Sequence, residues 1–271
     1  MLFSIIIPTY SSSKTIEACL NSVQLQTFKN FEVIVIDGLS TDDTLQITKK
    51  FEDKLNLLIF TEKDNGIYDA MNKGILKANG DYLYFLGSDD TLFKNNILAL
   101  VASEIAQNNA EIIYGNVKMI GKSNSAKNDL IYGNQFNLKR LIEHNIPHQA
   151  IFYHKKVFKT LGLYQTYYKL FADHDFNLKA FSIFKFHYID LVIANFALGG
   201  SSSTENDDKF NQDKIRNFIA YYATKIHKNH FINIRYYLKE AALNAKHRVS
   251  FLMRIYCLMI YAKHKLKSLL N

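Results

Sequence analysis

The stretch Gly80-Asp81-Tyr82-Leu83-Tyr84-Phe85-Leu86-Gly87-Ser88-Asp89-Asp90 decides the fold class of this chain. Residues 81–86 place five consecutive apolar or aromatic residues after Asp81, a run of strand length that predicts a buried strand. In open α/β sheets, ligands bind beyond the carboxyl ends of the strands, so Asp89 and Asp90 mark a predicted binding edge. Adjacent carboxylates repel each other unless a cation neutralises them, and hard oxygen ligands suit Mg²⁺ or Mn²⁺.

The segment before this strand has the clearest helical periodicity of the chain. Its apolar side follows the spacing i, i+3, i+4, i+7, i+8, i+11, at Ile67, Ala70, Met71, Gly74, Ile75 and Ala78. We expect Asn79-Gly80 to end this helix, with Gly80 in a left-handed cap.

Strands and helices alternate through the rest of the first half, which is typical of α/β units. Ser40-Thr41-Asp42-Asp43 has the pattern of a capping box that starts a helix. The predicted strands lie at 2–7, 31–36, 55–60 and 111–120, and a helix is predicted near 94–108. Beyond about residue 122 the pattern loosens. We expect strands at 149–153 and 186–196, helices at 155–162 and 172–183, a loop at 199–204, and helices from about 213 onward.

Composition favours an ordered protein of a reducing compartment. The chain has 271 residues, of which 48% are hydrophobic and only two are proline. Cys19 and Cys257 lie far apart in apolar helical patterns, so we expect no disulfide. The apolar start is stopped by Pro8 and has no basic lead, and no uncharged apolar run approaches 20 residues. These features predict a cytoplasmic protein.

The net charge of +8 is unevenly placed. Residues 215–271 carry eleven Lys or Arg and one acidic residue, a net charge of +10. Within them, residues 251–262 are apolar except for Arg254, and lysines flank the run. Such a segment is too short to span a bilayer but can lie at an anionic membrane surface. Packing on the domain or in a homodimer is the open alternative. No nucleic-acid-binding module accompanies the charge, so we expect no nucleic acid partner.

A second acidic residue, Asp37, also follows a predicted strand. Taken alone, such an aspartate is more often a turn or capping residue than a ligand. The loop after the first strand, Pro8-Thr9-Tyr10-Ser11-Ser12-Ser13, contains no Gly-x-Gly-x-x-Gly pattern. This excludes a dinucleotide-binding Rossmann motif and a P-loop, so bound phosphates would need a metal instead.

Four blocks in order resemble the GT-A-fold glycosyltransferases of family 2, close to the group that builds bacterial surface polysaccharides. The blocks are Ser4–Tyr10, Val33–Thr44, Glu62–Gly74 and Gly80–Asp90, and weaker likeness continues through His148–Ala150 and Ala172–Phe176. The resemblance implies an α/β GT-A fold, with a mixed central sheet flanked by helices and a C-terminal helical extension. It covers about 1–200. We therefore expect a glycosyltransferase domain at 1–210, with a nucleotide-binding half (1–120) and an acceptor-binding half (121–210), and a basic helical tail at 211–271.

The resemblance also implies roles for particular residues. The nucleotide sugar would contact Pro8, Tyr10, Asp37, Asp64 and Asp89, and Asp90 would bind Mg²⁺ or Mn²⁺. Asp173 would deprotonate the acceptor hydroxyl and so invert the anomeric carbon. Two departures from the family pattern stand out: Ala172 replaces a common Glu, and the metal motif reads Ser-Asp-Asp rather than Asp-x-Asp.

Two further residues are candidates for contacts with the acceptor or the diphosphate. His148 precedes an apolar run, where a structural histidine is equally expected. Asp175 lies two residues after Asp173, so on a helix the two side chains point about 200° apart and only one can face the acceptor. The other would then cap the helix.

These features predict an inverting glycosyltransferase that uses a nucleotide-diphospho-sugar, with a UDP-sugar as the first choice. The expected acceptor is a glycan or lipid-linked hydroxyl in cell-surface polysaccharide synthesis. A nucleotidyltransferase acting on sugar phosphates is an alternative, but it needs a basic glycine-rich loop after the first strand. A non-catalytic basic-tailed binding protein is the third reading, and it predicts no metal-dependent nucleotide affinity.

Overall fold

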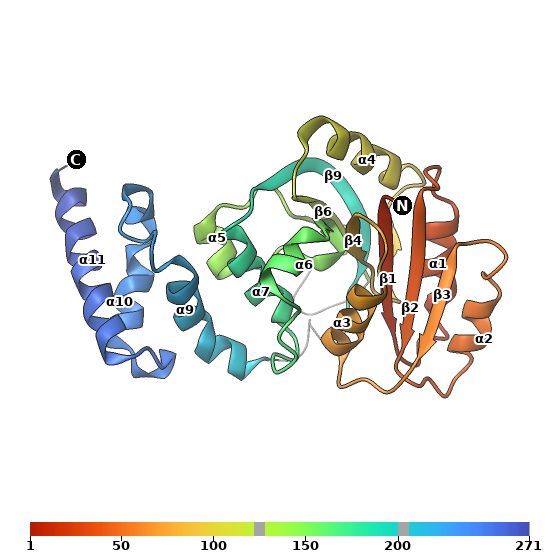
Figure 1. The fold of residues 1–271 in the computed structure, drawn as a ribbon, viewed down its shortest axis with the longest axis horizontal. Helices are drawn as coiled ribbons and strands as arrows, with labels where there is room; N and C mark the ends of the chain where they lie inside the picture. Colours follow the sequence, from red (N-terminus) through yellow and green to blue (C-terminus); the bar gives the residue numbers. More distant parts are fainter. Residues whose placement is uncertain (122–127, 200–205, 271) are drawn as a thin grey trace.

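The computed structural model describes residues 1–121, 128–199 and 206–270. Most of the predicted 199–204 loop lies outside these ranges. The molecule is elongated, with a sheet domain at one end and the C-terminal helices at the other (Figure 1).

The first half alternates strands and helices. Its elements are β1 (Phe3–Thr9), α1 (Ile16–Gln24), β2 (Phe31–Asp37), α2 (Thr44–Lys49), β3 (Leu57–Thr61), α3 (Ile67–Lys77), β4 (Tyr82–Phe85), β5 (Thr91–Leu92) and α4 (Ile97–Asn108). β1 pairs in parallel with both β2 and β4, and β2 pairs in parallel with β3.

The second half extends the same sheet. It contains β6 (Ile112–Ile120), β7 (Ile131–Tyr132), α5 (Leu138–Glu143), η1 (His148–Ala150), β8 (Ile151–His154), α6 (Lys156–Leu161), α7 (Ala172–Phe181) and β9 (Phe186–Ala197). β8 is antiparallel to both β4 and β6, and β9 is parallel to β6. The strand order is β3-β2-β1-β4-β8-β6-β9-β5, with β7 beside β6. The predicted mixed sheet flanked by helices is thus present, and the short elements β5, β7 and α5 were not expected from the sequence.

Alternate residues of the central strands face two separate cores. Ile6 and Ile34 pack on the side that α3 covers, with Met71. Ile5 and Val33 pack on the opposite side, against residues of α1 and α4. Because β1 and β2 are buried at every position, their sequences are nearly continuous apolar runs, interrupted by Ser4 and Glu32.

Two local predictions were wrong. Gly80 does not adopt a left-handed cap, because α3 ends at an extended Ala78. A Cβ on Gly80 would lie 2.6 Å from the backbone nitrogen of Ser4, so glycine is needed for close approach to β1. The capping box at Ser40–Asp43 also fails: Asp43 makes no capping bond, and Asp42 accepts the Thr44 amide at 3.1 Å instead.

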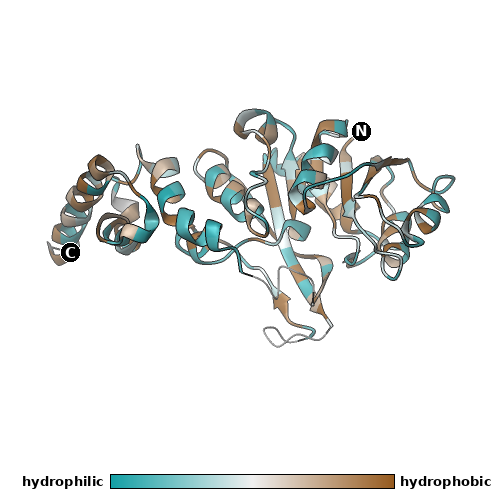
Figure 2. Cartoon of the chain, turned by 90° about the horizontal axis from the view of Figure 1, so that it is seen from below, coloured by the Kyte–Doolittle hydropathy of each residue, from teal (hydrophilic) through white to brown (hydrophobic). Residues whose placement is uncertain are grey.

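The tail consists of α9 (Asp208–Tyr222), η2 (Asn229–Ile234), α10 (Arg235–Leu243), η3 (Ala245–His247) and α11 (Phe251–Leu270). The predicted boundary at 210/211 falls inside α9, whose Phe210 and Phe218 join the hydrophobic core that α7 shares. Hydropathy varies around α11, at the outer end of the molecule (Figure 2). Cys19 and Cys257 are buried free thiols, as expected. Among the described helices, none is long and apolar enough to cross a membrane.

His174 in α7 should make the folded state sensitive to acid. Burial is the main reason that the pKa of His174 falls to about 4. Its Nε2 atom lies 2.6 Å from the Leu141 carbonyl oxygen. The unfolded chain therefore protonates the His174 ring more readily than the folded chain does. The free energy of unfolding then falls as pH drops from about 6.5 towards 4, by about 1.4 kcal/mol per pKa unit.

The variant His174→Gln keeps a donor for Leu141 but cannot titrate. We expect urea unfolding curves between pH 7 and pH 4 to show a shallower loss of stability for this variant. Equal slopes for both proteins would contradict the assignment.

Candidate active site

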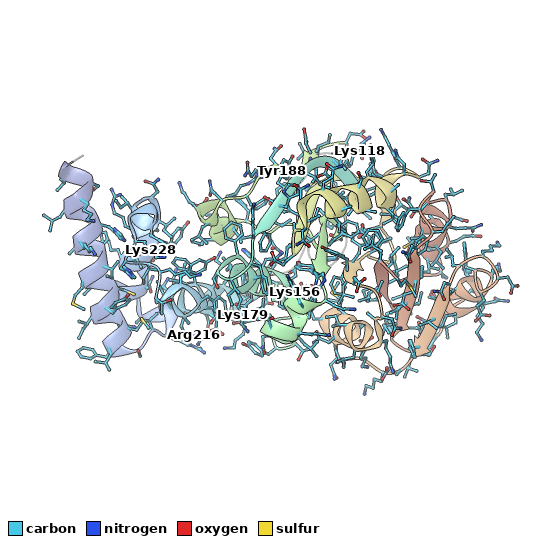
Figure 3. The ribbon with its side chains drawn as sticks, turned by 45° about the horizontal axis from the view of Figure 1, so that its top comes forward. Lys118, Lys156, Lys179, Tyr188, Arg216 and Lys228 are labelled. Carbon is cyan, nitrogen blue, oxygen red and sulfur yellow. The ribbon has the colours of Figure 1, made fainter. Side chains whose placement is uncertain are left out.

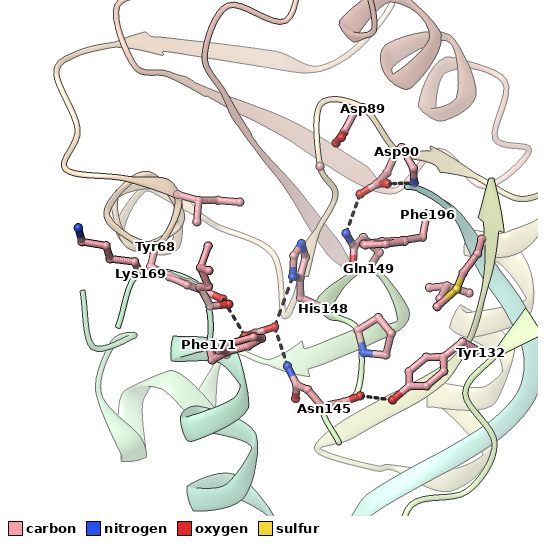
Figure 4. Close-up of a pocket in the computed structure, with 18 residues that line it drawn as sticks. Tyr68, Asp89, Asp90, Tyr132, Asn145, His148, Gln149, Lys169, Phe171 and Phe196 are labelled. Carbon is pink, nitrogen blue, oxygen red and sulfur yellow. Dashed lines mark hydrogen bonds and ion pairs between the residues drawn. The ribbon is translucent and has the colours of Figure 1, made fainter. Parts of the chain in front are cut away.

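A pocket of about 570 Å³ opens where the β4 turn, η1 and the start of α7 meet (Figure 4). Asp89, Asp90, His148 and Asp173 all line it, together with apolar residues such as Phe171. The sheet topology brings the β4 turn and η1 together. β4 is central in the sheet, and β8, which follows η1, pairs with it antiparallel.

The turn after β4 presents its two carboxylates differently. Asp90 is buried, and its oxygens accept hydrogen bonds from the Gln149 amide at 2.7 Å and the Ala197 backbone at 2.8 Å. Asp89 is exposed, and in the described part of the chain nothing donates a hydrogen bond to its carboxylate. Both side chains fold back over Gly87, where a Cβ would lie 2.5 Å from Asp90 Oδ2 and 2.9 Å from Asp89 Oδ1.

Burial and the neighbouring charge of Asp89 raise the pKa of Asp90 to about 6. Ser88 does not join the carboxylates. Its hydroxyl lies 2.8 Å from that of Ser12, which ties the turn to the loop after β1. Among the described residues, no cluster of three or more His, Cys, Asp or Glu is arranged to hold a metal by itself. A cation here would need ligands from its substrate.

Asp173 lies across the pocket from this turn and is almost fully buried. Its Oδ1 accepts from the Tyr68 hydroxyl at 2.7 Å and from the His174 backbone at 2.9 Å. Its Oδ2 accepts from the Asn145 amide at 2.9 Å and lies 3.4 Å from His148 Nδ1. Burial opposes ionisation, yet the contacts with His148 and Tyr68 hold the pKa of Asp173 below its ordinary value.

His148 stands between the two acidic groups. Its Nδ1 faces Asp173, and its buried Nε2 has no hydrogen-bond partner in the described structure. Figure 4 shows the His148 ring pointing towards the turn that carries Asp89. A buried polar atom without a partner costs free energy, so Nε2 is suited to a ligand in the pocket.

A second group of predicted residues gathers at the ends of β1 and β2. Asp37 is buried and accepts the Ser40 amide at 3.1 Å. A Cβ on Gly38 would lie 2.4 Å from Asp64 Oδ2 and 3.4 Å from the Tyr10 ring. Pro8 is buried in β1, whereas Tyr10 is 65% exposed. Tyr10, Asp37 and Asp64 are therefore neighbours around Gly38.

The three serines of the loop after β1 offer no free backbone amide to cradle a phosphate. Their backbone N–H groups all donate within the protein, at 2.7–3.0 Å, to Ser40, Thr44 and Asp42.

Known proteins resemble the chain in both sequence and fold. Residues 4–162, more than half of the chain, match the family described as "Glycosyl transferase family 2". The chain belongs to this glycosyltransferase family.

Its relatives include proteins of glycan biosynthesis. A "PGL/p-HBAD biosynthesis glycosyltransferase" of Mycobacterium bovis is 40% identical over 216 residues, which is 77% of this chain and 82% of the relative. The "Poly(ribitol-phosphate) beta-N-acetylglucosaminyltransferase TarS" of Staphylococcus aureus is 38% identical over 125 residues, or 45% of this chain and 21% of that protein.

Solved structures show the same fold. A crystal structure of S. aureus TarS residues 1–349 with UDP-GlcNAc has a TM-score of 0.72 at 22% identity, covering 97% of this chain and 81% of that one. A mannosyltransferase from Pyrobaculum calidifontis with GDP-Man and Mn²⁺ has a TM-score of 0.57 at 15% identity, covering 99% and 75%. The GT-A fold expected from the sequence is confirmed.

Within this glycosyltransferase, the predicted site residues fall into two neighbouring groups and one outlier. Asp175 does not line the pocket. Its carboxylate accepts from Asn217 at 2.7 Å and Tyr221 at 2.9 Å, both in α9. Burial raises the pKa of Asp175. The divergence of Asp173 and Asp175 follows from their two-residue spacing on one helix.

Sequence reasoning missed the residues that hold the carboxylates in place. Tyr68, Asn145 and Gln149 line the pocket and bond to Asp173 or Asp90. Tyr68 and Gln149 do stand inside blocks that resemble the family, which was the available signal. Asn145 lies just before such a block, so the sequence gave no signal for its role.

Gly87 offers a test of the turn. The variant Gly87→Ala should push both carboxylates aside, because its Cβ has no room beside Asp90 and Asp89. We expect nucleotide-sugar affinity, measured by calorimetry with Mn²⁺ present, to fall about tenfold or more, equivalent to about 1.4 kcal/mol. Leu76→Ala is the control, since Leu76 is exposed on α3 and lies outside the pocket lining. Unchanged affinity for Gly87→Ala would contradict this description of the turn.

Proposed function

We propose that this glycosyltransferase moves a sugar from a nucleoside diphosphate to an acceptor hydroxyl in a single displacement with inversion. The observation that carries the proposal is the opposition of two acidic groups across one pocket. Asp89 and Asp90 end a central strand, and Asp173 begins a helix on the far side. Such an arrangement suits a leaving diphosphate on one side and an attacking hydroxyl on the other.

The group around Gly38 suits the nucleoside. Tyr10 offers an exposed ring for a base, and Asp37 and Asp64 offer carboxylates for ribose or base donors. We take a uridine nucleotide as the first choice, since the TarS neighbour is described with UDP-GlcNAc and UDP. The neighbour described with GDP-Man makes guanosine the next to try.

Asp89 and Asp90 fit a divalent cation that also binds the substrate's phosphates. Mg²⁺ and Mn²⁺ are commonly bound by one or two carboxylates, and oxygens of the substrate's phosphates complete the coordination. Asp89 has uncommitted oxygens, and each Asp90 oxygen accepts only one hydrogen bond from the described chain. The sequence assigned the cation to Asp90 alone, but this geometry favours Asp89 as the more accessible ligand. A cation bound there would offset charge that develops on the leaving diphosphate.

We propose Asp173 as the general base. A sugar hydroxyl needs a carboxylate within hydrogen-bond reach, and the contacts of Asp173 favour its ionised form. His148 Nδ1 lies 3.4 Å from Asp173 Oδ2, which leaves Nε2 free to accept from the acceptor hydroxyl or, when the ring is protonated, to donate to the diphosphate.

The rival functions fit less well. A nucleotidyltransferase would use the loop after the first strand to hold phosphates, but the serine amides of this loop are already bonded within the protein. A non-catalytic binding protein gives no reason to bury an ionisable carboxylate in a pocket wall, which is costly.

For the acceptor, we propose a hydroxyl of a glycan or a lipid-linked intermediate in the synthesis of cell-surface polymers. The relatives named above support this class, because their names refer to PGL/p-HBAD and to poly(ribitol-phosphate). Asp175 belongs to the α7–α9 contact in this proposal and does not touch the acceptor.

We also propose that α11 rests on an anionic membrane surface. Cys257 and His264 face inward, and an apolar stripe covers the opposite side of the helix: Phe251, Leu252, Ile255, Leu258, Met259, Leu266 and Leu269. With a turn of 100° per residue, Lys263 and Lys265 flank this stripe on its two sides.

An apolar stripe flanked by cations is the pattern of an interfacial helix. Other cations also belong to the tail, among them Arg216 and Lys228 (Figure 3). A second copy docked through the same stripe would bring like charges together, which disfavours the homodimer.

The base assignment predicts a specific difference between two neighbouring aspartates. Asp173→Asn should lower kcat by at least about 10²-fold, the lower range for general-base removal, while nucleotide affinity hardly changes. Asp175→Asn is the matched control and should keep most of its turnover. If the Asp175 variant is inactive and the Asp173 variant is not, the base has been assigned to the wrong side of the helix.

The membrane assignment predicts that the chain sediments with phosphatidylglycerol vesicles at low salt and is released at high salt. Replacing Phe251 and Leu252 with serine should remove most of this binding, because both are more than three-quarters exposed on the apolar stripe. Leu76→Ser is the control, since Leu76 is 73% exposed but lies on α3. Dimers in light scattering without vesicle binding would overturn the proposal.

A further inference from the structure

The hydroxyl of Tyr68 has one hydrogen and two acceptors. Its oxygen lies 2.7 Å from Asp173 Oδ1 and 2.7 Å from the Leu170 carbonyl oxygen. A phenol donates one hydrogen bond and can accept others. When Asp173 is ionised, the single hydrogen can therefore satisfy only one of these two oxygens at a time.

Neither acceptor is free to move away. The backbone N–H of Leu170 donates at 3.0 Å to Asp207, which also caps α9 by accepting the Phe210 amide. Asp173 is held by Asn145 and by the His174 backbone. The Tyr68 ring is buried, so the hydroxyl stays between the two oxygens.

A proton on Asp173 resolves the shortage of donors. With the carboxyl protonated at Oδ1, Asp173 donates to the Tyr68 oxygen, and the Tyr68 hydrogen turns to the Leu170 carbonyl. Both oxygens are then satisfied. With the carboxyl ionised, the Tyr68 hydrogen turns back to Asp173. The hydroxyl can therefore serve both charge states of the base without movement of the backbone.

We propose that Tyr68 is a positioning residue that sets the proton affinity of Asp173 and holds its carboxylate in both charge states. This inference rests on the proposed function, in which Asp173 receives the acceptor's proton. In that step the acceptor O–H bond breaks, its oxygen bonds to the anomeric carbon, the diphosphate leaves with the electron pair of the broken C–O bond, and the proton passes to Asp173.

The test is the pH profile of slow donor hydrolysis, using whichever of UDP-GlcNAc, UDP-Glc or GDP-Man the enzyme turns over. Tyr68→Phe removes the hydrogen bond that Tyr68 donates to ionised Asp173, and this bond lowers the pKa of Asp173. The bond to the charged carboxylate is stronger than each neutral bond that replaces it on protonation, so its loss decides the direction of the shift. The acid limb of kcat should therefore move up by about one pH unit, since a bond to a charged group is worth about 1.5 kcal/mol or more. At fixed acidic pH, kcat should fall about tenfold, while KM for the donor stays unchanged.

Tyr82→Phe is the matched control. Its buried hydroxyl also donates at 2.7 Å to a backbone carbonyl, that of Ala110, but it lies outside the pocket lining. The acid limb of this variant should match that of the wild type.

A second variant of nearly the same shape keeps the test decisive if Tyr68→Phe does not fold. Replacing Tyr68 with 3-fluorotyrosine makes the hydroxyl a stronger donor, so the acid limb should move to lower pH.

The influence of other groups around Asp173 on the acid limb must be distinguished from that of Tyr68. The titratable or charged groups that face it or Tyr68 are His148, His174, Tyr153, Tyr164 and Asp207. The pKa of His174 is lowered by burial, and burial raises the pKa of Tyr153 and Tyr164 well above the usual range. His148 touches Asp173 directly, so the comparison is repeated in a His148→Gln background, where the shift should persist.

The outcomes distinguish the two levels of the proposal. An acid limb that does not move in Tyr68→Phe, with activity lost equally at every pH, makes Tyr68 merely structural and overturns this inference. A wild-type profile without any acid limb overturns the proposed base itself, and the role of Tyr68 with it.

Discussion

The buried carboxylate of Asp173 is the point on which the two halves of the domain depend. Burying a charge is costly unless donors surround it, and here the side-chain donors come from three separate segments. Tyr68 comes from α3, Asn145 from the segment after α5, and His148 from η1. Because α3 also packs beneath β1 and β2, the same contacts join the pocket wall that α7 forms to the parallel strands of the sheet. Removing any one donor would leave the charge less well compensated and would weaken that junction.

A second set of contacts ties the tail to the same helix. Asp175 on α7 bonds to Asn217 and Tyr221 of α9, and Asp207 at the start of α9 holds Leu170 beside the pocket. The tail therefore supports the pocket wall from behind, through α7 and Leu170, although none of its described residues lines the pocket. If α11 rests on a membrane, as proposed, these bonds fix the angle at which the pocket meets a lipid-linked acceptor.

The sequence predicted the repetitive parts of the fold well, because local periodicity reflects burial on one or two faces. The runs at β1 and β2 are nearly continuous because both faces are covered, and α3 shows a single apolar side. Gly80 was misread because a helix end and a close backbone approach both favour glycine, and only the tertiary structure separates them. The partners of Asp90 and Asp173 could not be predicted, since Gln149 lies 59 residues from Asp90 and Tyr68 lies 105 residues from Asp173. No local pattern reports such distant contacts.

The central claim is a single displacement served by one carboxylate, and the stereochemistry of the product tests it most directly. Proton NMR can identify the anomer first released when the enzyme slowly hydrolyses a UDP-α-sugar such as UDP-GlcNAc, before the free sugar equilibrates. The account predicts that the β anomer appears first. Initial release of the α anomer would mean retention, and it would contradict both the mechanism and the role given to Asp173.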